Sequence, residues 1–149
     1  MLNSASLHFR SLLKVAAVSD TRRSTKPSPP LRVLVADDER DTADSLFRIL
    51  YHEGYEVRAA YDGAEALQVA REFHPDVVIL DIGMPQVSGY DVARALRARY
   101  AGVVLVAVTA YKQSTDKILA QIAGFDRHFG KPCDPNAIVN LLADIKLSR

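Results

Sequence analysis

The hydrophobic residues of this chain are arranged in a pattern that few folds can accommodate. Three runs, at residues 31–36, 77–80 and 103–108, are almost wholly aliphatic and show no alternation of apolar and polar positions. Such runs are typical of strands that are covered on both faces, as in a parallel sheet. We expect a more polar fourth strand at residues 55–60, nearer an edge of the sheet, and a short fifth strand that ends before Lys131.

Helical periodicities lie between and after these runs. The clearest is an apolar stripe in the last segment, which follows Asp134 and Pro135, a favourable pair for the N-cap and first turn of a helix. The apolar positions of the five expected helices are Ala43, Leu46, Phe47 and Leu50; Ala64, Leu67 and Ala70; Val92, Ala93 and Leu96; Ile118, Leu119 and Ile122; and Ile138, Leu141, Leu142 and Ile145. Strand and helix alternate five times, which predicts an α/β fold: a doubly wound, five-stranded parallel sheet with five helices and right-handed crossovers.

The length of 149 residues fits one domain with an extension. Residues 1–30 carry five Lys or Arg and one acid, and the rest of the chain carries 14 basic and 17 acidic residues. Three prolines lie within residues 27–30. We expect residues 1–30 to be a basic, disordered extension or linker rather than an organellar transit peptide, and residues 31–149 to be the domain.

The composition also limits the partners. A mildly acidic domain disfavours a nucleic-acid-binding surface, because phosphate backbones require clustered cations. No apolar stretch approaches the roughly 18 residues that span a bilayer. A single cysteine, Cys133, excludes an internal disulfide and fits a reducing cytoplasm. We therefore expect a cytoplasmic protein that binds neither nucleic acid nor membrane.

Acidic residues follow two of the expected strands. Asp37 and Asp38 come after the first aliphatic run, and Asp81 comes after the run at residues 77–80. Ligands of such sheets bind outside the carboxyl ends of the strands, so the three carboxylates converge if the first and third strands are neighbours. Two carboxylates about 4 Å apart repel by roughly 4 kcal/mol at an effective dielectric of 20. The cluster therefore needs protonation or a cation, and a set of oxygen ligands with open positions suits Mg²⁺.

Two further polar residues are expected at the same rim. Thr109 follows the run at residues 103–108 and offers a hydroxyl, and Lys131 closes the fifth segment with a fixed positive charge. A carboxylate, a divalent metal, an ammonium group and a hydroxyl together form a set suited to phosphoryl transfer.

Four motifs occur in the order and at the spacings of one known family. They are Asp37-Asp38-Glu39, Asp81-Ile82-Gly83-Met84-Pro85, Val108-Thr109-Ala110 and Gly130-Lys131-Pro132. Residues 31–147 thus resemble the receiver domain of two-component response regulators. The segment from Gly124 to Phe129 is most similar to receivers of hybrid histidine kinases or to stand-alone receivers. The resemblance implies the strand order 2-1-3-4-5.

The resemblance implies a phosphoacceptor site. Asp81 would accept the phosphoryl group, and Asp38, Asp81 and the backbone carbonyl of Gly83 would bind Mg²⁺. Asp37 would support the water shell of the metal.

The resemblance also implies which residues respond to phosphorylation and which control the loss of the phosphoryl group. Thr109 would hold a phosphoryl oxygen, and Lys131 would pair with the acyl phosphate. His128 stands where many receivers carry an aromatic residue that turns inward after phosphorylation. Gly83 and Tyr111 would flank the path of the hydrolytic water, and their sizes imply slow autodephosphorylation.

The functional prediction is a single-domain response regulator, because the fifth helix reaches almost to the last residue. It would take its phosphoryl group from a histidine kinase or a histidine phosphotransfer protein and signal to an unidentified protein through its fourth helix and fifth strand. It would not be an enzyme acting on a separate substrate. The alternative is a degenerate receiver that works as a phosphorylation-independent docking module, although no core site residue is missing.

Two other classes fit the motifs poorly. A flavodoxin-like electron carrier needs a phosphate-binding loop where Asp37, Asp38 and Glu39 would repel a flavin phosphate. An aspartyl-phosphate hydrolase needs a second acid two residues after Asp81, where this chain has Gly83.

Overall fold

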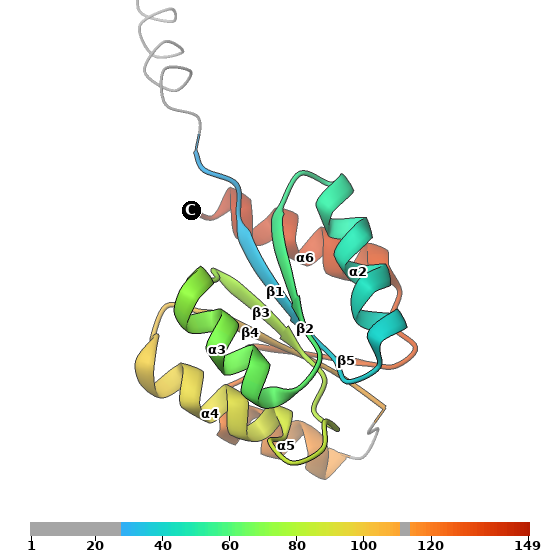
Figure 1. Ribbon diagram of the computed structural model, residues 1–149, viewed down its shortest axis with the longest axis vertical. Helices are drawn as coiled ribbons and strands as arrows, with labels where there is room; N and C mark the ends of the chain where they lie inside the picture. Colours follow the sequence, from blue (N-terminus) through green and yellow to red (C-terminus); the bar gives the residue numbers. More distant parts are fainter. Residues whose placement is uncertain (1–27, 111–113) are drawn as a thin grey trace, which may run out of the picture.

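The computed structural model describes residues 28–110 and 114–149, including their side chains except those of residues 114–117. These residues form one parallel sheet of five strands, and its order, β2-β1-β3-β4-β5, is the one that the family resemblance implies (Figure 1). The strands are β1 (Arg32–Ala36), β2 (Glu56–Ala60), β3 (Val77–Leu80), β4 (Val104–Thr109) and β5 (Arg127–Gly130). The helices are α2 (Arg40–His52), α3 (Gly63–Phe73), α4 (Gly89–Arg99), α5 (Ser114–Ala123) and α6 (Pro135–Leu147).

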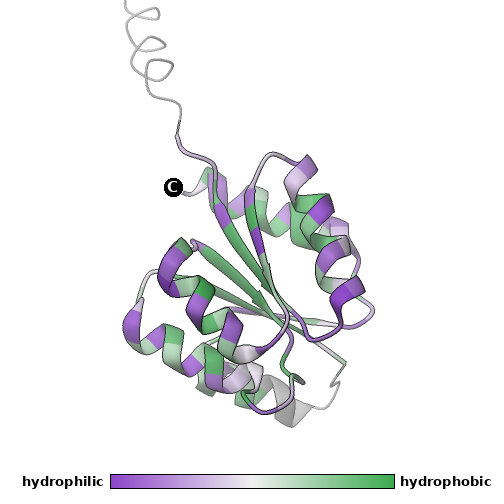
Figure 2. Cartoon of the chain, viewed as in Figure 1, coloured by the Kyte–Doolittle hydropathy of each residue, from purple (hydrophilic) through white to green (hydrophobic). Residues whose placement is uncertain are grey.

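The helices cover both faces of the sheet. One face is covered by α2 and α6 and the other by α3, α4 and α5 (Figure 1). Alternate residues of β1 supply the two hydrophobic cores: Val33 and Val35 face the first pair of helices, and Leu34 and Ala36 face the other three. Figure 2 shows the consequence, since the inner strands of the sheet are mainly hydrophobic while the helices carry a polar outer surface. This double covering explains the unbroken aliphatic runs.

Local sequence signals set the helix starts. Asp134 accepts a hydrogen bond from the Asn136 N–H, and Pro135 occupies the first turn of α6. Ser88 and Asp91 form a reciprocal capping box at the start of α4. The helix before β2 is followed by Gly54 at φ 94°, a conformation that favours glycine.

The register brings the carboxyl ends of the strands to one rim. Ala36 of β1 lies opposite Leu80 of β3, and Thr109 of β4 lies opposite Gly130 of β5. The residues that follow these positions are therefore neighbours. Residues 1–27 and Tyr111 lie outside the described part of the chain. Within the described part, no helix has the length and apolar character needed to cross a bilayer.

Candidate phosphoacceptor site

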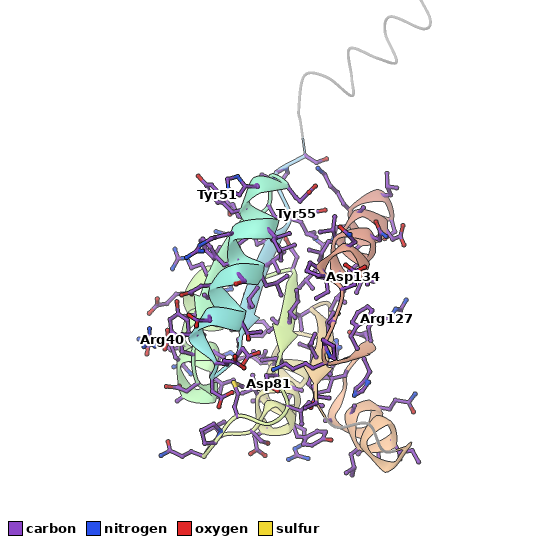
Figure 3. All side chains as sticks on the ribbon, turned by 90° about the vertical axis from the view of Figure 1, so that its right-hand side faces the viewer. Arg40, Tyr51, Tyr55, Asp81, Arg127 and Asp134 are labelled. Atoms are coloured by element: carbon purple, nitrogen blue, oxygen red, sulfur yellow. The ribbon has the colours of Figure 1, made fainter. Side chains whose placement is uncertain are left out.

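Three carboxylates meet at the rim, as the sequence predicts. The Asp81 N–H donates to the Ala36 carbonyl at 2.9 Å, which fixes the start of the β3–α4 loop beside the end of β1. Asp37, Asp38 and Asp81 each offer an oxygen, and these oxygens lie within 4.8 Å of one another. Asp37 and Asp81 are 5% and 8% exposed, whereas Asp38 is exposed to solvent. Figure 3 shows Asp81 near the end of the molecule that also holds Arg40, at the start of α2.

Lys131 places its ammonium group against this cluster. Its Nζ atom lies 2.9 Å from Asp37 Oδ2 and 3.6 Å from Asp81 Oδ2. The backbone also ties the residue to the rim, because the Lys131 N–H donates to the Thr109 carbonyl at 2.8 Å. The Lys131–Pro132 peptide bond is cis.

The electrostatics of the site follow from this crowding. Burial, together with the nearby Asp37 carboxylate, raises the pKa of Asp81 to about 6, although the Gly83 N–H and Lys131 oppose the shift. Burial alone would lower the pKa of Lys131. The hydrogen bond to Asp37 and the attraction of Asp81 outweigh that effect, so the pKa of Lys131 is raised and the ammonium form is held. The site is a charged lysine facing a carboxylate cluster that is costly to ionise fully.

The oxygens of Asp37 and Asp81 are engaged differently. Asp37 Oδ2 accepts from Lys131, and Asp37 Oδ1 accepts from the Glu39 N–H at 2.9 Å. Asp81 Oδ1 accepts from the Gly83 N–H at 3.1 Å, while Asp81 Oδ2 has the longer contact of 3.6 Å to Lys131. Lys131 therefore contacts Asp37 Oδ2 more closely than Asp81 Oδ2.

Thr109 and His128 lie on the neighbouring strands β4 and β5. Thr109 ends β4 and is buried. His128 of β5 lies opposite Ala107, two residues before Thr109, so Thr109 and His128 project from the same face of the sheet. His128 is half-buried, and its Nε2 atom is buried without a hydrogen-bond partner among the described residues. The predicted pairing of Gly83 with Tyr111 involves a residue outside the described part of the chain.

Gly89 supports the site in a way that the sequence motifs do not reveal. A Cβ atom at this position would overlap the Asp81 carbonyl oxygen and the Ile82 Cα atom, so α4 begins in direct backbone contact with the Asp81 loop. The Gly89 N–H also donates to the Ile82 carbonyl at 3.1 Å. A glycine directly after an N-cap serine is the only available sequence signal, and by itself it indicates a helix start rather than close packing.

Comparison with known proteins identifies the family. The family model of the response regulator receiver domain matches residues 33–143, and the chain belongs to this family. It is a receiver domain of the two-component response regulators, as the four motifs predict.

The curated relatives are longer than this chain. The DNA-binding response regulator MtrA of Mycobacterium tuberculosis is 39% identical over 108 residues, which cover 72% of this chain and 47% of MtrA. The response regulator MprA of a Mycobacterium species (strain KMS) is 37% identical over 117 residues, which cover 78% of this chain and 50% of MprA. The chain thus spans about half the length of the curated relatives it matches.

Solved structures share the fold over most of this chain. A putative response regulator from Chloroflexus aurantiacus has a TM-score of 0.73 at 32% identity, covering 81% of this chain and 100% of its own. A CheY-like receiver domain protein from Methanospirillum hungatei has a TM-score of 0.74 at 26% identity, covering 78% of this chain and 93% of its own.

Proposed function

We propose that this receiver accepts a phosphoryl group on Asp81 from a phosphohistidine donor, either a histidine kinase or a histidine phosphotransfer protein, in a reaction that depends on Mg²⁺. The observation that carries the proposal is the environment of Asp81. Its carboxylate is buried at the rim, faces Lys131 at 3.6 Å and lies beside two other carboxylates.

The engagement of the carboxylate oxygens favours Asp81 over Asp37 as the nucleophile. Both oxygens of Asp37 accept hydrogen bonds at 2.9 Å, so attack through either would break one of them. Asp81 Oδ2 has a longer contact to Lys131, at 3.6 Å, so it can form the bond to phosphorus while the bond from phosphorus to the donor imidazole breaks. The imidazole nitrogen takes up a proton as it leaves.

The donor set fits a hard divalent cation. Only oxygen ligands are present, two of the three carboxylates are buried, and the exposed Asp38 leaves an open side. We assign Asp38, Asp81 and the Gly83 carbonyl as ligands of Mg²⁺, with Asp37 acting through a water. The ion would neutralise charge on the phosphoryl oxygens.

Lys131 and Thr109 would then contact the oxygens of the phosphoryl group. Lys131 is charged and can exchange its contact with Asp81 for one with a phosphoryl oxygen, and the buried Thr109 hydroxyl lies on the adjoining strand end. Because the Lys131 N–H is bonded to the Thr109 carbonyl, a shift of either residue reaches both β4 and β5. His128, on the same face as Thr109, would respond to that shift.

The output would be a change in protein binding. Helix α5 follows β4 and presents three exposed apolar residues, Ile118, Leu119 and Ile122, that a protein partner could cover. We propose that the chain signals as a stand-alone receiver through this surface, without binding nucleic acid itself. Among its relatives, MtrA is described as DNA-binding and has about twice the length that this chain matches.

The test is phosphotransfer from a purified, phosphorylated histidine phosphotransfer protein to the full chain. Wild type should gain the label with Mg²⁺ and lose that ability with EDTA. Asp81→Asn should gain none, whereas the matched control Asp144→Asn, on the exposed surface of α6, should behave as wild type. Equal labelling of Asp81→Asn, or labelling in EDTA, would overturn the proposal.

A further inference from the structure

Strand β2 forms an open edge of the sheet. It pairs with β1 only and lies between α2 and α3 (Figure 1). The Glu56 N–H donates to the Leu31 carbonyl, and the Ala60 carbonyl accepts from the Asp37 N–H, both at 3.1 Å. Since peptide groups alternate along a strand, those of Val57 and Ala59 point away from β1. They form a short row of donors and acceptors that is available to another strand.

The surface around this edge combines apolar and charged side chains. A groove of about 550 Å³ lies between β2 and α2, and its lining residues are Phe47, Val57, Ala59 and Tyr61 together with Asp44, Arg48 and Arg58. Tyr51 stacks on Phe47, with ring centroids 6.1 Å apart, and is 62% exposed. Such a surface supplies both backbone groups and apolar area to an incoming strand.

Within one copy of the chain, one of the two charged residues of β2 forms an ion pair and the other does not. Glu56 Oε2 is 3.0 Å from Arg32 Nε. Arg58 is exposed and lies over the Phe73 ring, at 5.0 Å from its centroid, and no carboxylate of the described residues forms an ion pair with it. The edge therefore carries a cation without a counterion, two residues away from a carboxylate.

These charges select one symmetric pairing of two β2 strands. A two-fold axis at Val57 sets Val57 opposite its symmetry mate and sets each Glu56 opposite the Arg58 of the second copy. An axis at Arg58 would also use the outward peptide groups of Val57 and Ala59, but it would set Arg58 opposite the Arg58 of the second copy. An axis at Ala59 would set Arg58 opposite Ala60. Only the pairing about Val57 uses outward peptide groups and matches opposite charges across the strands.

We propose that two copies of this chain associate through antiparallel β2 strands, with the two-fold axis at Val57, into one continuous sheet. Val57 exchanges its N–H and C=O with the same residue of the second copy, and two Glu56–Arg58 pairs flank it. The exposed Phe47–Tyr51 stacks of the two α2 helices come to the same face of that sheet. This edge is opposite to β5 in the sheet, and we expect the association to be independent of phosphorylation at Asp81.

Charge exchange on the full chain tests this pairing. We expect sedimentation equilibrium of the wild type to show a monomer–dimer equilibrium. Arg58→Glu should weaken the dimer about tenfold or more, because both cross-strand pairs become repulsive. The double variant Glu56→Arg/Arg58→Glu should restore the wild-type dissociation constant to within about threefold, because the pairs are attractive again with their signs exchanged. The matched control Arg99→Glu makes the same change of charge on the exposed surface of α4 and should have no effect.

A second variant tests the backbone contact. Val57→Pro removes the outward N–H and should also weaken the dimer, while the bonds to β1 remain. Circular dichroism melting would establish that Val57→Pro is folded. If this variant does not fold, the charge-exchange variants still test the proposed strand pairing.

Three results would overturn the proposal: a wild type that stays monomeric, a dimer that Arg58→Glu leaves intact, or a double variant that does not recover. A dimer that Ile122→Lys abolishes and Arg58→Glu spares would place the interface on α5 instead.

Discussion

Replacing Asp81 with asparagine should stabilise the metal-free protein at neutral and alkaline pH. Burial and the neighbouring Asp37 raise the pKa of Asp81 to about 6, whereas the ordinary value is 3.8. One pKa unit corresponds to 1.36 kcal/mol, so the ionised carboxylate costs the folded state about 3 kcal/mol at most. Asparagine keeps an oxygen for the Gly83 N–H but carries no charge. We expect Asp81→Asn to raise the free energy of unfolding by about 2 kcal/mol.

The sign of the pH dependence follows from the raised pKa. Well below pH 3.8 the Asp81 carboxyl is protonated in both the folded and the unfolded state, and the stability that this group contributes to the wild type is fully present. As the pH rises through 6, the folded state must give up a proton that it binds more tightly than the unfolded state does, and that stability is lost. The gain in Asp81→Asn should therefore be small at pH 4 and reach its full value by pH 8.

Urea unfolding in EDTA, followed by circular dichroism from pH 4 to pH 8, would measure this difference. Adding Mg²⁺ should change the comparison in the opposite direction, because an ion that binds only the folded state stabilises that state by mass action. The ion should raise the stability of the wild type more than that of Asp81→Asn. A variant that is less stable than the wild type in EDTA at pH 8, or a difference that does not change with pH, would refute the reasoning.

The remaining predictions concern the response, the lifetime of the signal and the extension. Lys131→Ala should still accept a phosphoryl group but show smaller chemical-shift changes around Thr109, because the link to β5 is cut; changes equal to those of wild type would contradict this role. Gly83→Asn combined with Tyr111→Ala should shorten the phosphoryl lifetime about tenfold, which is about 1.4 kcal/mol in barrier, by opening and orienting the path of the hydrolytic water; an unchanged lifetime would exclude this role. Deletion of residues 1–30 should leave phosphorylation unchanged and alter the free energy of unfolding by less than about 1 kcal/mol in urea, and a larger loss would show that the extension packs on the domain.

Much of the fold could be predicted because its signals are local. Doubly covered strands appear as aliphatic runs, and Asp134 and Pro135 mark the start of α6. The predicted first residues of two strands were one position too early. Leu31 and Tyr55 lie just before β1 and β2, although both are buried. Burial of an apolar residue extends beyond the last ladder hydrogen bond, so hydrophobicity alone does not locate a strand end.

The convergence of the acidic residues was predictable once β1 and β3 were taken as neighbours, but the contacts between distant residues were not. Lys131 reaches Asp37 across 94 positions of sequence, and which oxygen each donor selects depends on the assembled rim. Arg97 is a second example, since its guanidinium donates to the carbonyls of Val103 and Gly124 and to the Asp126 carboxylate. On a helix surface such an arginine is indistinguishable by sequence from a solvated one.

Direct chemical identification of the phosphorylated residue would test the central claim. The full chain would be treated with acetyl phosphate and Mg²⁺, and the acyl phosphate would be reduced with borohydride, which converts a phosphorylated aspartate to homoserine. Peptide mass spectrometry should then find homoserine at position 81, and none in a sample treated in EDTA. Homoserine at Asp37 or Asp38 instead, or none in the presence of Mg²⁺, would contradict the assignment of Asp81 as the phosphoacceptor.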